Sequence, residues 1–321
     1  MTKEIMKTND FTFCDRPNLL LSTILTYNAT DIAFSTYGEH WRQIRKICVI
    51  ELLNAKSVQS FRSIREEEVS NLVKSISASE GSVVNLTHKI LATTYGIIAQ
   101  TAFGKRNIRQ EAFKLAIDEA LTLLGGVCIV DLYPSIKMLQ RHPLADDNLK
   151  AVIQHLFTAG GETSSGAVLW ATSEMVKNPK VMEEAQVEVR RVFDGKGERC
   201  QINGYEIPAK TRIVVNAWAI GRNPRYWIEA DSFKPERFVN SLIDFKGTDF
   251  EYIPFGAGRR MCPGIAFAIP NVELPLAQLL YNFDWKLPNG MKNEELNMTE
   301  SFGITAGRKY DLCLIPITRR T

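Results

Sequence analysis

The chain has 321 residues, of which 45% are hydrophobic and 23% charged, and its formal net charge is +3. This composition excludes an intrinsically disordered chain and supplies enough apolar residues for one large globular domain or two ordinary ones. The net charge is too small to indicate a nucleic-acid partner.

The N-terminal residues 1–11 carry charges where a signal peptide would have its apolar core. Nowhere in the sequence do about 18 apolar residues run together. From this chain alone we therefore expect neither secretion nor a membrane span. The six cysteines are widely spaced and form no C-x-x-C pair, which favours a reducing compartment.

The stretch "YGEHWRQIRK" at residues 37–46 has the composition of a short basic helix. Trp41 and Arg45 are four residues apart, so a helix would place them on one face. An exposed basic turn with a packed tryptophan would explain the same residues.

A long helix is predicted over residues 147–178, because apolar residues recur at helical spacing and Pro179 ends the pattern. It contains "AGGETSS" at residues 159–165. Gly160 and Gly161 each cost about 1 kcal/mol relative to alanine inside a helix, so some other contribution must offset them. For the next two residues, Glu162 and Thr163, the ordinary interpretation is a solvated carboxylate beside a hydroxyl bonded to its own helix.

Residues 181–193 predict a second, amphipathic helix that stops at "DGKG". Beyond it, Asn203 and Gly204 predict a tight hairpin turn, and the β-branched residues at 211–215 predict a strand. The sequence therefore predicts a mainly α fold with a small β region.

The loop "PFGAGRRMCPG" at residues 254–264 precedes another helical stretch. Cys262 stands before a proline, where an N-cap would lie, so we expect its sulfur to face the positive end of that helix. That field and the nearby Arg260 should lower the pKa of the thiol. The glycines keep side chains away, so backbone could approach a flat, bulky cofactor. A buried free cysteine is the simpler alternative, and a phosphate-binding loop is a further one, although no Lys-Ser/Thr follows the glycines.

The loop fits the pattern F-x-x-G-x-R-x-C-x-G, through Phe255, Gly258, Arg260, Cys262 and Gly264. This pattern resembles the haem-binding signature of the cytochrome P-450 family. The resemblance implies that Cys262 is the thiolate ligand of the haem iron. It also implies that Arg260 pairs with a haem propionate and that Phe255 packs near the sulfur.

Other stretches resemble the same family in the expected order. Trp41 and Arg45 are similar to the pair that holds the haem propionates. Glu162 and Thr163 are similar to the acid–alcohol pair that supplies protons to dioxygen, on a helix whose glycines make room for it. In "FKPERF" at residues 233–238, Arg237 is similar to the arginine that joins an E-x-x-R helix.

The resemblance covers nearly all of residues 1–321, as a single haem-thiolate monooxygenase domain, but three blocks of the family are missing. They are the N-terminal anchor region, the mid-chain helices that roof the substrate pocket, and the E-x-x-R helix. Glu188 and Arg191 do spell E-x-x-R, but in the preceding amphipathic helix, where such spacing is common. We therefore expect Arg237 to turn to solvent or to pair with another carboxylate.

The implied function is a monooxygenase that hydroxylates a small lipophilic substrate. The implied cofactor is haem b (iron protoporphyrin IX), with electrons from NADPH through a cytochrome reductase. The C-terminal half resembles plant A-type members, especially premnaspirodiene-oxygenase-like sesquiterpene hydroxylases, which favours a terpenoid substrate. The family implies the cytosolic face of the endoplasmic reticulum membrane, and the missing anchor leaves the cytoplasm open. A non-catalytic haem-binding chain, or an inert truncated remnant or splice form, is the alternative function.

Overall fold

The computed structural model describes residues 2–104, 148–182 and 214–319, apart from positions 9, 18, 20, 21, 24, 25, 27, 180, 240 and 304. The turn predicted at Asn203 and Gly204 lies outside these residues, as do Glu188, Arg191 and most of the helix predicted over 181–193. Of the strand predicted over 211–215, only the last two residues are described, and they lie in irregular backbone.

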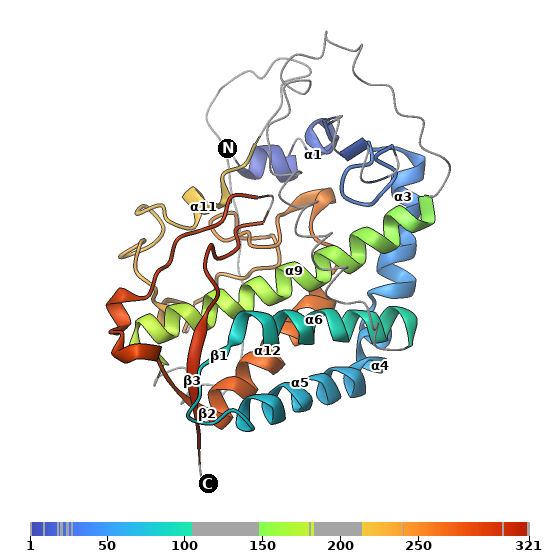
Figure 1. Ribbon diagram of the computed structural model, residues 1–321. Helices are drawn as coiled ribbons and strands as arrows, with labels where there is room; N and C mark the ends of the chain where they lie inside the picture. Colours follow the sequence, from blue (N-terminus) through green and yellow to red (C-terminus); the bar gives the residue numbers. More distant parts are fainter. Residues whose placement is uncertain are drawn as a thin grey trace, which may run out of the picture.

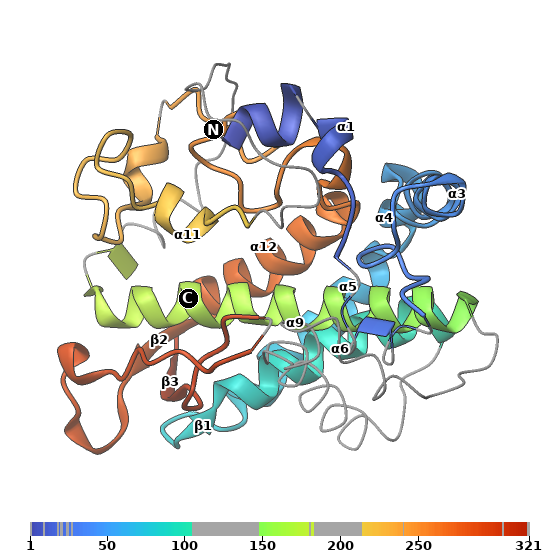
Figure 2. The same ribbon diagram turned by 90° about the horizontal axis from the view of Figure 1, so that it is seen from above.

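The helix α9, Asn148–Lys177, runs through the centre of the described structure (Figures 1 and 2). Its bounds confirm the long helix predicted from the sequence, which ends just before Asn178 and Pro179. Two of its buried hydroxyl side chains are each satisfied by a carbonyl one turn back. Thr172 donates to Val168 over 2.8 Å and Ser173 donates to Leu169 over 2.6 Å.

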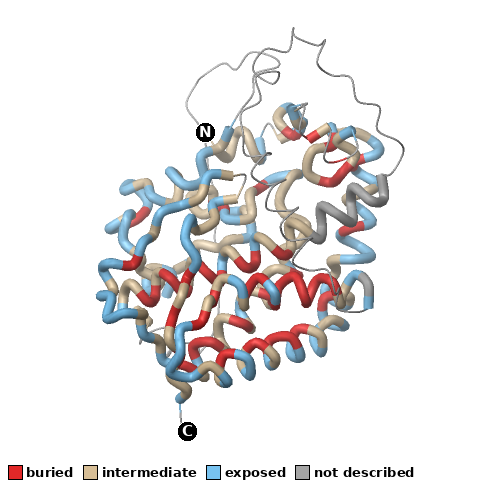
Figure 3. Tube along the Cα trace, viewed as in Figure 1, coloured by how far each residue is buried: buried red, intermediate tan, exposed pale blue. Residues whose placement is uncertain are grey.

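Two helices pack directly on α9: α6, Leu86–Phe103, and α12, Ile265–Asn282. A fourth helix, α5, Arg62–Ser77, packs on α6 and α12. Buried positions concentrate along these four helices (Figure 3). The main core includes Ile76 of α5, Ile90 of α6, Val168 of α9 and Leu279 of α12. The helix α1, Asp10–Phe13, the helix α11, Ala217–Ile220, and the loop before α12 lie on the other side of α9 from α6 (Figures 1 and 2).

The remaining helical elements are short. The α-helices are α1, Asp10–Phe13, α3, Glu39–Ile47, α4, Ala55–Ser60, and α11, Ala217–Ile220. Two π-helical turns span Glu4–Thr8 and Cys48–Leu52, and 3-10 turns span Pro235–Phe238, Gly258–Arg260, Pro288–Gly290 and Asn293–Glu295. The helix α3 confirms the helix predicted around Trp41.

A small antiparallel sheet joins the ends of the core helices. Its strands are β1, Val84–Asn85, β2, Phe283–Lys286, and β3, Cys313–Thr318, in the order β1-β3-β2. β1 leads directly into α6 and α12 leads directly into β2. The described structure is therefore mainly α with a small β region, as predicted. None of the helices in its described parts is both long and apolar enough to span a bilayer.

The two adjacent glycines of α9 allow this helix to approach α6 closely. A Cβ atom at Gly161 would lie 2.5 Å from Cε1 of Tyr95, and one at Gly160 would lie 3.1 Å from Cδ1 of Ile98. The family resemblance predicted that the space beside these glycines accommodates dioxygen. In the structure, side chains of α6 fill it at Gly161, so helix packing offsets the cost of that glycine.

The first prediction tests this contact. The substitution Gly161→Ala should destabilise the protein by about 1–3 kcal/mol, because the new methyl group overlaps the Tyr95 ring. Gly166→Ala, in the same helix, meets nothing within 4 Å and should be neutral or stabilising by up to about 1 kcal/mol. Urea denaturation of both variants measures the difference. Equal midpoints would show that the packing of α9 on α6 does not need Gly161.

Candidate functional site

The loop that contains Cys262 is closed by its own backbone hydrogen bonds. The Cys262 N–H donates to the Phe255 carbonyl over 3.0 Å, and Gly258 has a φ of 69°, which side chains disfavour. A Cβ at Gly258 would also lie 2.0 Å from the Met6 carbonyl oxygen, so the N-terminal segment packs directly on this loop. The sequence analysis did not predict that contact, which joins segments about 250 residues apart.

The position of Cys262 relative to α12 differs from the prediction. The N-cap is Gly264, whose carbonyl accepts from Ala268 over 2.8 Å, so Cys262 lies two residues before the cap. The hydrogen bond from the Cys262 N–H to the Phe255 carbonyl holds the cysteine in the loop. The sulfur nevertheless lies near the helix start, 3.8 Å from where a Cβ of Gly264 would be.

Burial raises the pKa of the Cys262 thiol, which is the opposite of the predicted direction. The Gly264 N–H and the Arg45 guanidinium lower it, but their combined effect is smaller. The cation that acts on this thiol is therefore Arg45, where the sequence analysis expected Arg260. Since a metal ion deprotonates a thiol that coordinates it, the protein alone favours the neutral thiol and a bound metal would favour the thiolate.

Trp41 and Arg45 of α3 come together with Arg260, which is more than 200 residues away in the sequence. The Arg260 guanidinium carbon lies 4.2 Å from the centroid of the Trp41 ring, and that of Arg45 lies 5.3 Å from it. Arg45 also donates to the Met261 carbonyl over 2.7 Å, next to Cys262. The indole N–H of Trp41 donates to the Ile32 carbonyl over 2.9 Å. Trp41 therefore contacts the two guanidinium groups through its ring.

Arg260 tests whether these residues fit an anionic cofactor. Its Nε donates to the Cys14 carbonyl over 2.6 Å and its Nη2 to the Ser35 carbonyl over 2.7 Å. Its Nη1 is buried and has no hydrogen-bond partner in the part of the chain that the structure describes. Burial and the nearby charge of Arg16 lower the pKa of Arg260 to about 10, so it stays charged at neutral pH. A carboxylate would satisfy this buried cation, and a thiol lies beside the same cluster, so the residues fit haem.

Glu162 and Thr163 point in different directions. The Thr163 hydroxyl is exposed and donates to the Ala159 carbonyl over 2.5 Å. Glu162 accepts from the Tyr95 hydroxyl over 3.4 Å, toward α6. Thr163 is two residues beyond Gly161, which rotates it by about 200° around α9. Because Gly161 faces α6, Thr163 lies on the side of α9 where the Cys262 loop is found.

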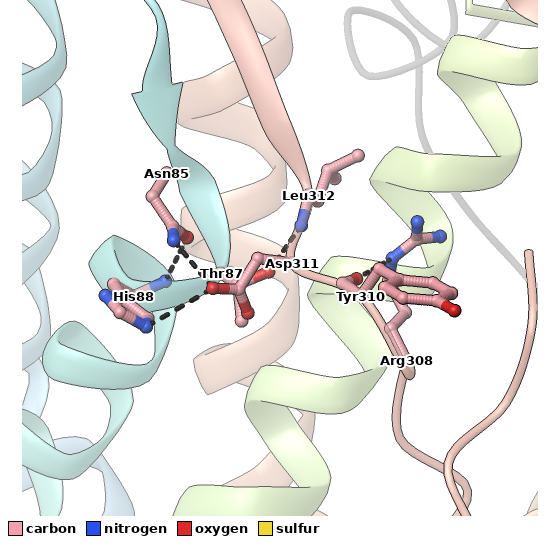
Figure 4. A network of polar contacts seen from close by, with 7 residues as sticks. All are labelled: Asn85, Thr87, His88, Arg308, Tyr310, Asp311 and Leu312. Atoms are coloured by element: carbon pink, nitrogen blue, oxygen red, sulfur yellow. Dashed lines mark hydrogen bonds and ion pairs between the residues drawn. The ribbon is translucent and has the colours of Figure 1, made fainter. Parts of the chain in front are cut away.

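Glu162 also lines a cavity of about 240 Å³ between α6, α9 and residues 301–311. Thr87 and Asp311, which line it, belong to a polar network at the start of α6 (Figure 4). Asp311 accepts from Asn85 over 2.7 Å and lies 3.4 Å from the ring Nε2 of His88. Thr87 accepts from the Leu312 N–H over 2.8 Å. Sequence reasoning missed these residues because their contacts join positions more than 200 apart.

Arg237 satisfies its guanidinium group in a way that the sequence analysis did not predict. It donates to the carbonyls of Glu229, Ser232 and Lys234 over 3.0, 2.7 and 3.0 Å. Its guanidinium carbon lies 5.9 Å from the centroid of the Trp227 ring. Local backbone carbonyls supply the acceptors in place of the expected carboxylate, and the Nη2 end of Arg237 is exposed, in line with the expected turn to solvent.

A comparison with protein-family models identifies the family. A sequence model described as cytochrome P-450 matches residues 1–143, 130–201 and 197–314. The chain belongs to the cytochrome P-450 family. A solved zebrafish cytochrome P-450 with abiraterone has a TM-score of 0.79 at 19% identity, over 100% of this chain and 91% of that one. At this identity the similarity supports the cytochrome P-450 fold.

Curated plant proteins are more similar in sequence. Cytochrome P-450 71D10 of Glycine max is 52% identical over 412 aligned positions, which cover 99% of this chain and 81% of the relative. Premnaspirodiene oxygenase of Hyoscyamus muticus is 40% identical over 409 positions, which cover 98% and 82%. Both alignments are longer than the 321 residues of the chain, so they include stretches of the relatives without a counterpart here.

Membership of the cytochrome P-450 family makes the chain a haem-thiolate monooxygenase. The family uses haem, acts on small substrates and receives electrons that originate from NADPH through a reductase. In the described residues, His, Cys, Asp and Glu side chains form no group of three or more that could hold a metal ion.

The second prediction tests the charge that acts on Cys262. In haem-free protein, Arg45→Gln should raise the pKa of the Cys262 thiol further, because the substitution removes the cation that stabilises the thiolate. The pH dependence of iodoacetamide alkylation, followed by mass spectrometry of the Cys262 peptide, measures this shift. Arg42→Gln is the control, since Arg42 is exposed on the same helix and pairs with Glu39. A shift of equal size in both variants would mean that net charge, and not the contact with Arg45, controls the thiol.

Proposed function

We propose that Cys262 ligates the iron of haem b and that the chain hydroxylates a small lipophilic, terpenoid substrate. The buried, partnerless Nη1 of Arg260 carries this proposal, because it calls for an anion beside the thiol. The names of the relatives support the substrate class, since they include Premnaspirodiene oxygenase and Salviol synthase.

Each residue of the loop has a defined part in this site. Cys262 supplies the sulfur ligand, and Gly258 lets the loop backbone pass close to the Met6 carbonyl. The Phe255 carbonyl accepts the hydrogen bond that fixes the Cys262 backbone. The centroid of the Phe255 ring lies 5.9 Å from that of the Phe245 ring. The chemistry that bound haem would supply is the reduction of dioxygen, with one of the two oxygen atoms inserted into the substrate.

The guanidinium groups of Arg45 and Arg260 would hold the haem propionates by charge-assisted hydrogen bonds. Trp41 would keep the two groups in place through its ring, because its N–H is already bonded to Ile32. The opposite charges of the propionates would also offset the cost of burying Arg260.

Thr163 would hold a proton at its Oγ1 on the side of α9 that faces the Cys262 loop. Glu162 would exchange protons with the cavity near Tyr95, because its side chain points there. The two side chains, about 100° apart around α9, would then act as a relay between cavity and site.

An NADPH-cytochrome reductase is the proposed electron donor, and the cytosolic face of the endoplasmic reticulum membrane is the proposed location. Membership of the family supports both. We further propose that residues 1–321 form one domain that lacks internal blocks of its relatives. The family match supports this, because it divides into three pieces that meet near residues 130–143 and 197–201.

The second candidate function is a non-catalytic or inert remnant. One observation favours it: the relatives contain internal stretches that this chain lacks. Loss of helices over the substrate would let water reach the iron, so reduced oxygen would leave without product.

The third prediction tests the haem ligand. The reduced carbon-monoxide complex of the purified chain should show the red-shifted Soret band of a thiolate ligand, and Cys262→Ser should abolish it. Cys313→Ser is the matched control, because Cys313 is also half-buried but lies in β3.

Persistence of the band in Cys262→Ser would contradict the ligand assignment. Haem content separates the two candidate functions. Full loading and product formation with a reductase support the enzyme, whereas a chain that stays haem-poor and inactive, beside a version with the internal blocks restored, supports the remnant.

The fourth prediction tests the proton-holding role of Thr163. With haem bound normally, Thr163→Ala should lower product formation by about 100-fold, while NADPH consumption continues and hydrogen peroxide accumulates. Thr163→Ser, which keeps the hydroxyl, should retain most of the coupling between NADPH use and product. Unchanged coupling in Thr163→Ala would remove this side chain from the mechanism.

A further inference from the structure

A buried carboxylate organises the turn at residues 31–35. Asp31 is completely buried, with an exposed fraction of 0%. Its Oδ1 accepts from the Ala33 N–H over 2.7 Å and from the Phe34 N–H over 3.2 Å. Its carbonyl accepts from the Ser35 N–H over 3.2 Å. Hydrogen bonds of this kind fix a turn from within, because one side chain satisfies several backbone groups at once.

The carbonyl groups of this turn hold three side chains of the candidate site. The Ile32 carbonyl accepts from the Trp41 indole over 2.9 Å. The Ala33 carbonyl accepts from Arg16 Nε over 3.0 Å, and the Ser35 carbonyl accepts from Arg260 Nη2 over 2.7 Å. These three side chains come from α3, from the N-terminal segment and from the Cys262 loop. The turn is therefore the common support of the cluster.

The charge of Asp31 also acts on a member of this cluster. It stabilises the charged form of Arg16, together with Asp15, and so offsets part of the burial that lowers the pKa of Arg16. Arg260 keeps a buried Nη1 that has no hydrogen-bond partner in the described residues, so this atom is available to an external anion.

We propose that Asp31 is a positioning residue for haem: it fixes the turn whose carbonyls aim Arg260 and Trp41 at the haem propionates. The inference rests on the proposed haem site, but it concerns a residue outside the signature loop and outside α3. It acts through Arg260 and Trp41, so its effect must depend on the propionates.

The experiment compares two porphyrins. Wild-type protein and Asp31→Asn are loaded with haem or with haem whose two propionates are methyl esters, and the transfer of each to apomyoglobin is timed. Asp31→Asn should release haem about tenfold faster, as expected for one weakened charge-assisted contact, and should release the ester at the wild-type rate. Asp284→Asn is the control, because Asp284 is exposed. Equal acceleration for both porphyrins would show a general structural role and overturn the proposal.

A second measurement decides the proposal without haem. In haem-free protein, Asp31→Asn should increase the rate at which phenylglyoxal modifies Arg260. The weakened turn would hold the Ser35 carbonyl, which accepts from Arg260 Nη2, less firmly. If wild-type protein takes up no haem, the proposed function fails, and this rate alone decides whether Asp31 positions Arg260. An unchanged rate would overturn the inference. Should Asp31→Asn fail to fold, Asp31→Ser keeps an oxygen acceptor for the turn and is measured in its place.

Discussion

The close contact between α9 and α6 is the packing constraint on which the candidate site depends. It needs the glycines at 160 and 161, because a side chain at Gly161 would overlap the Tyr95 ring. Once this face of α9 is fixed against α6, the helical repeat places Thr163 on the opposite face. The same rotation directs Glu162 sideways, toward Tyr95 and the cavity. A packing contact between two helices thus decides which polar side chains can face the Cys262 loop.

The other side of the site is governed by buried positive charge. Arg16, Arg45 and Arg260 each have a pKa lowered first of all by burial. Backbone carbonyls and the ring of Trp41 satisfy part of each group, but they are neutral and cannot balance a charge. A cluster of this kind favours a ligand with carboxylates. The raised pKa of the Cys262 thiol is a matching feature, because a metal ion at the sulfur removes the proton that burial retains.

Local patterns predicted the elements and the residues that carry chemistry. Helical spacing and Pro179 predicted α9, and the order of residues in the signature loop identified the candidate ligand. What the sequence could not predict are quantities that depend on burial and on distant contacts. The direction of the Cys262 pKa required the desolvation of the folded loop. The role of Asp31 required contacts between its turn and Arg260, whose positions differ by more than 220. Arg237 found carbonyl acceptors within eight residues, which a search for charged partners overlooks.

The hydrogen-bond acceptors of Arg237 also affect the expected stability of a chain that lacks internal stretches of its relatives. A buried cation without a partner would cost several kcal/mol, enough to unfold a marginal domain. That cost does not apply to Arg237, because it is only partly buried and three carbonyls and the Trp227 ring satisfy its guanidinium group. The remaining cost lies in apolar surface: Val214, Trp218 and Ile228 are 89%, 61% and 86% exposed. Exposed apolar residues in one region favour association more than unfolding. The segment that leads to the Cys262 loop can therefore keep its local structure, and solubility is the property that the exposed side chains of residues 214–228 put at risk.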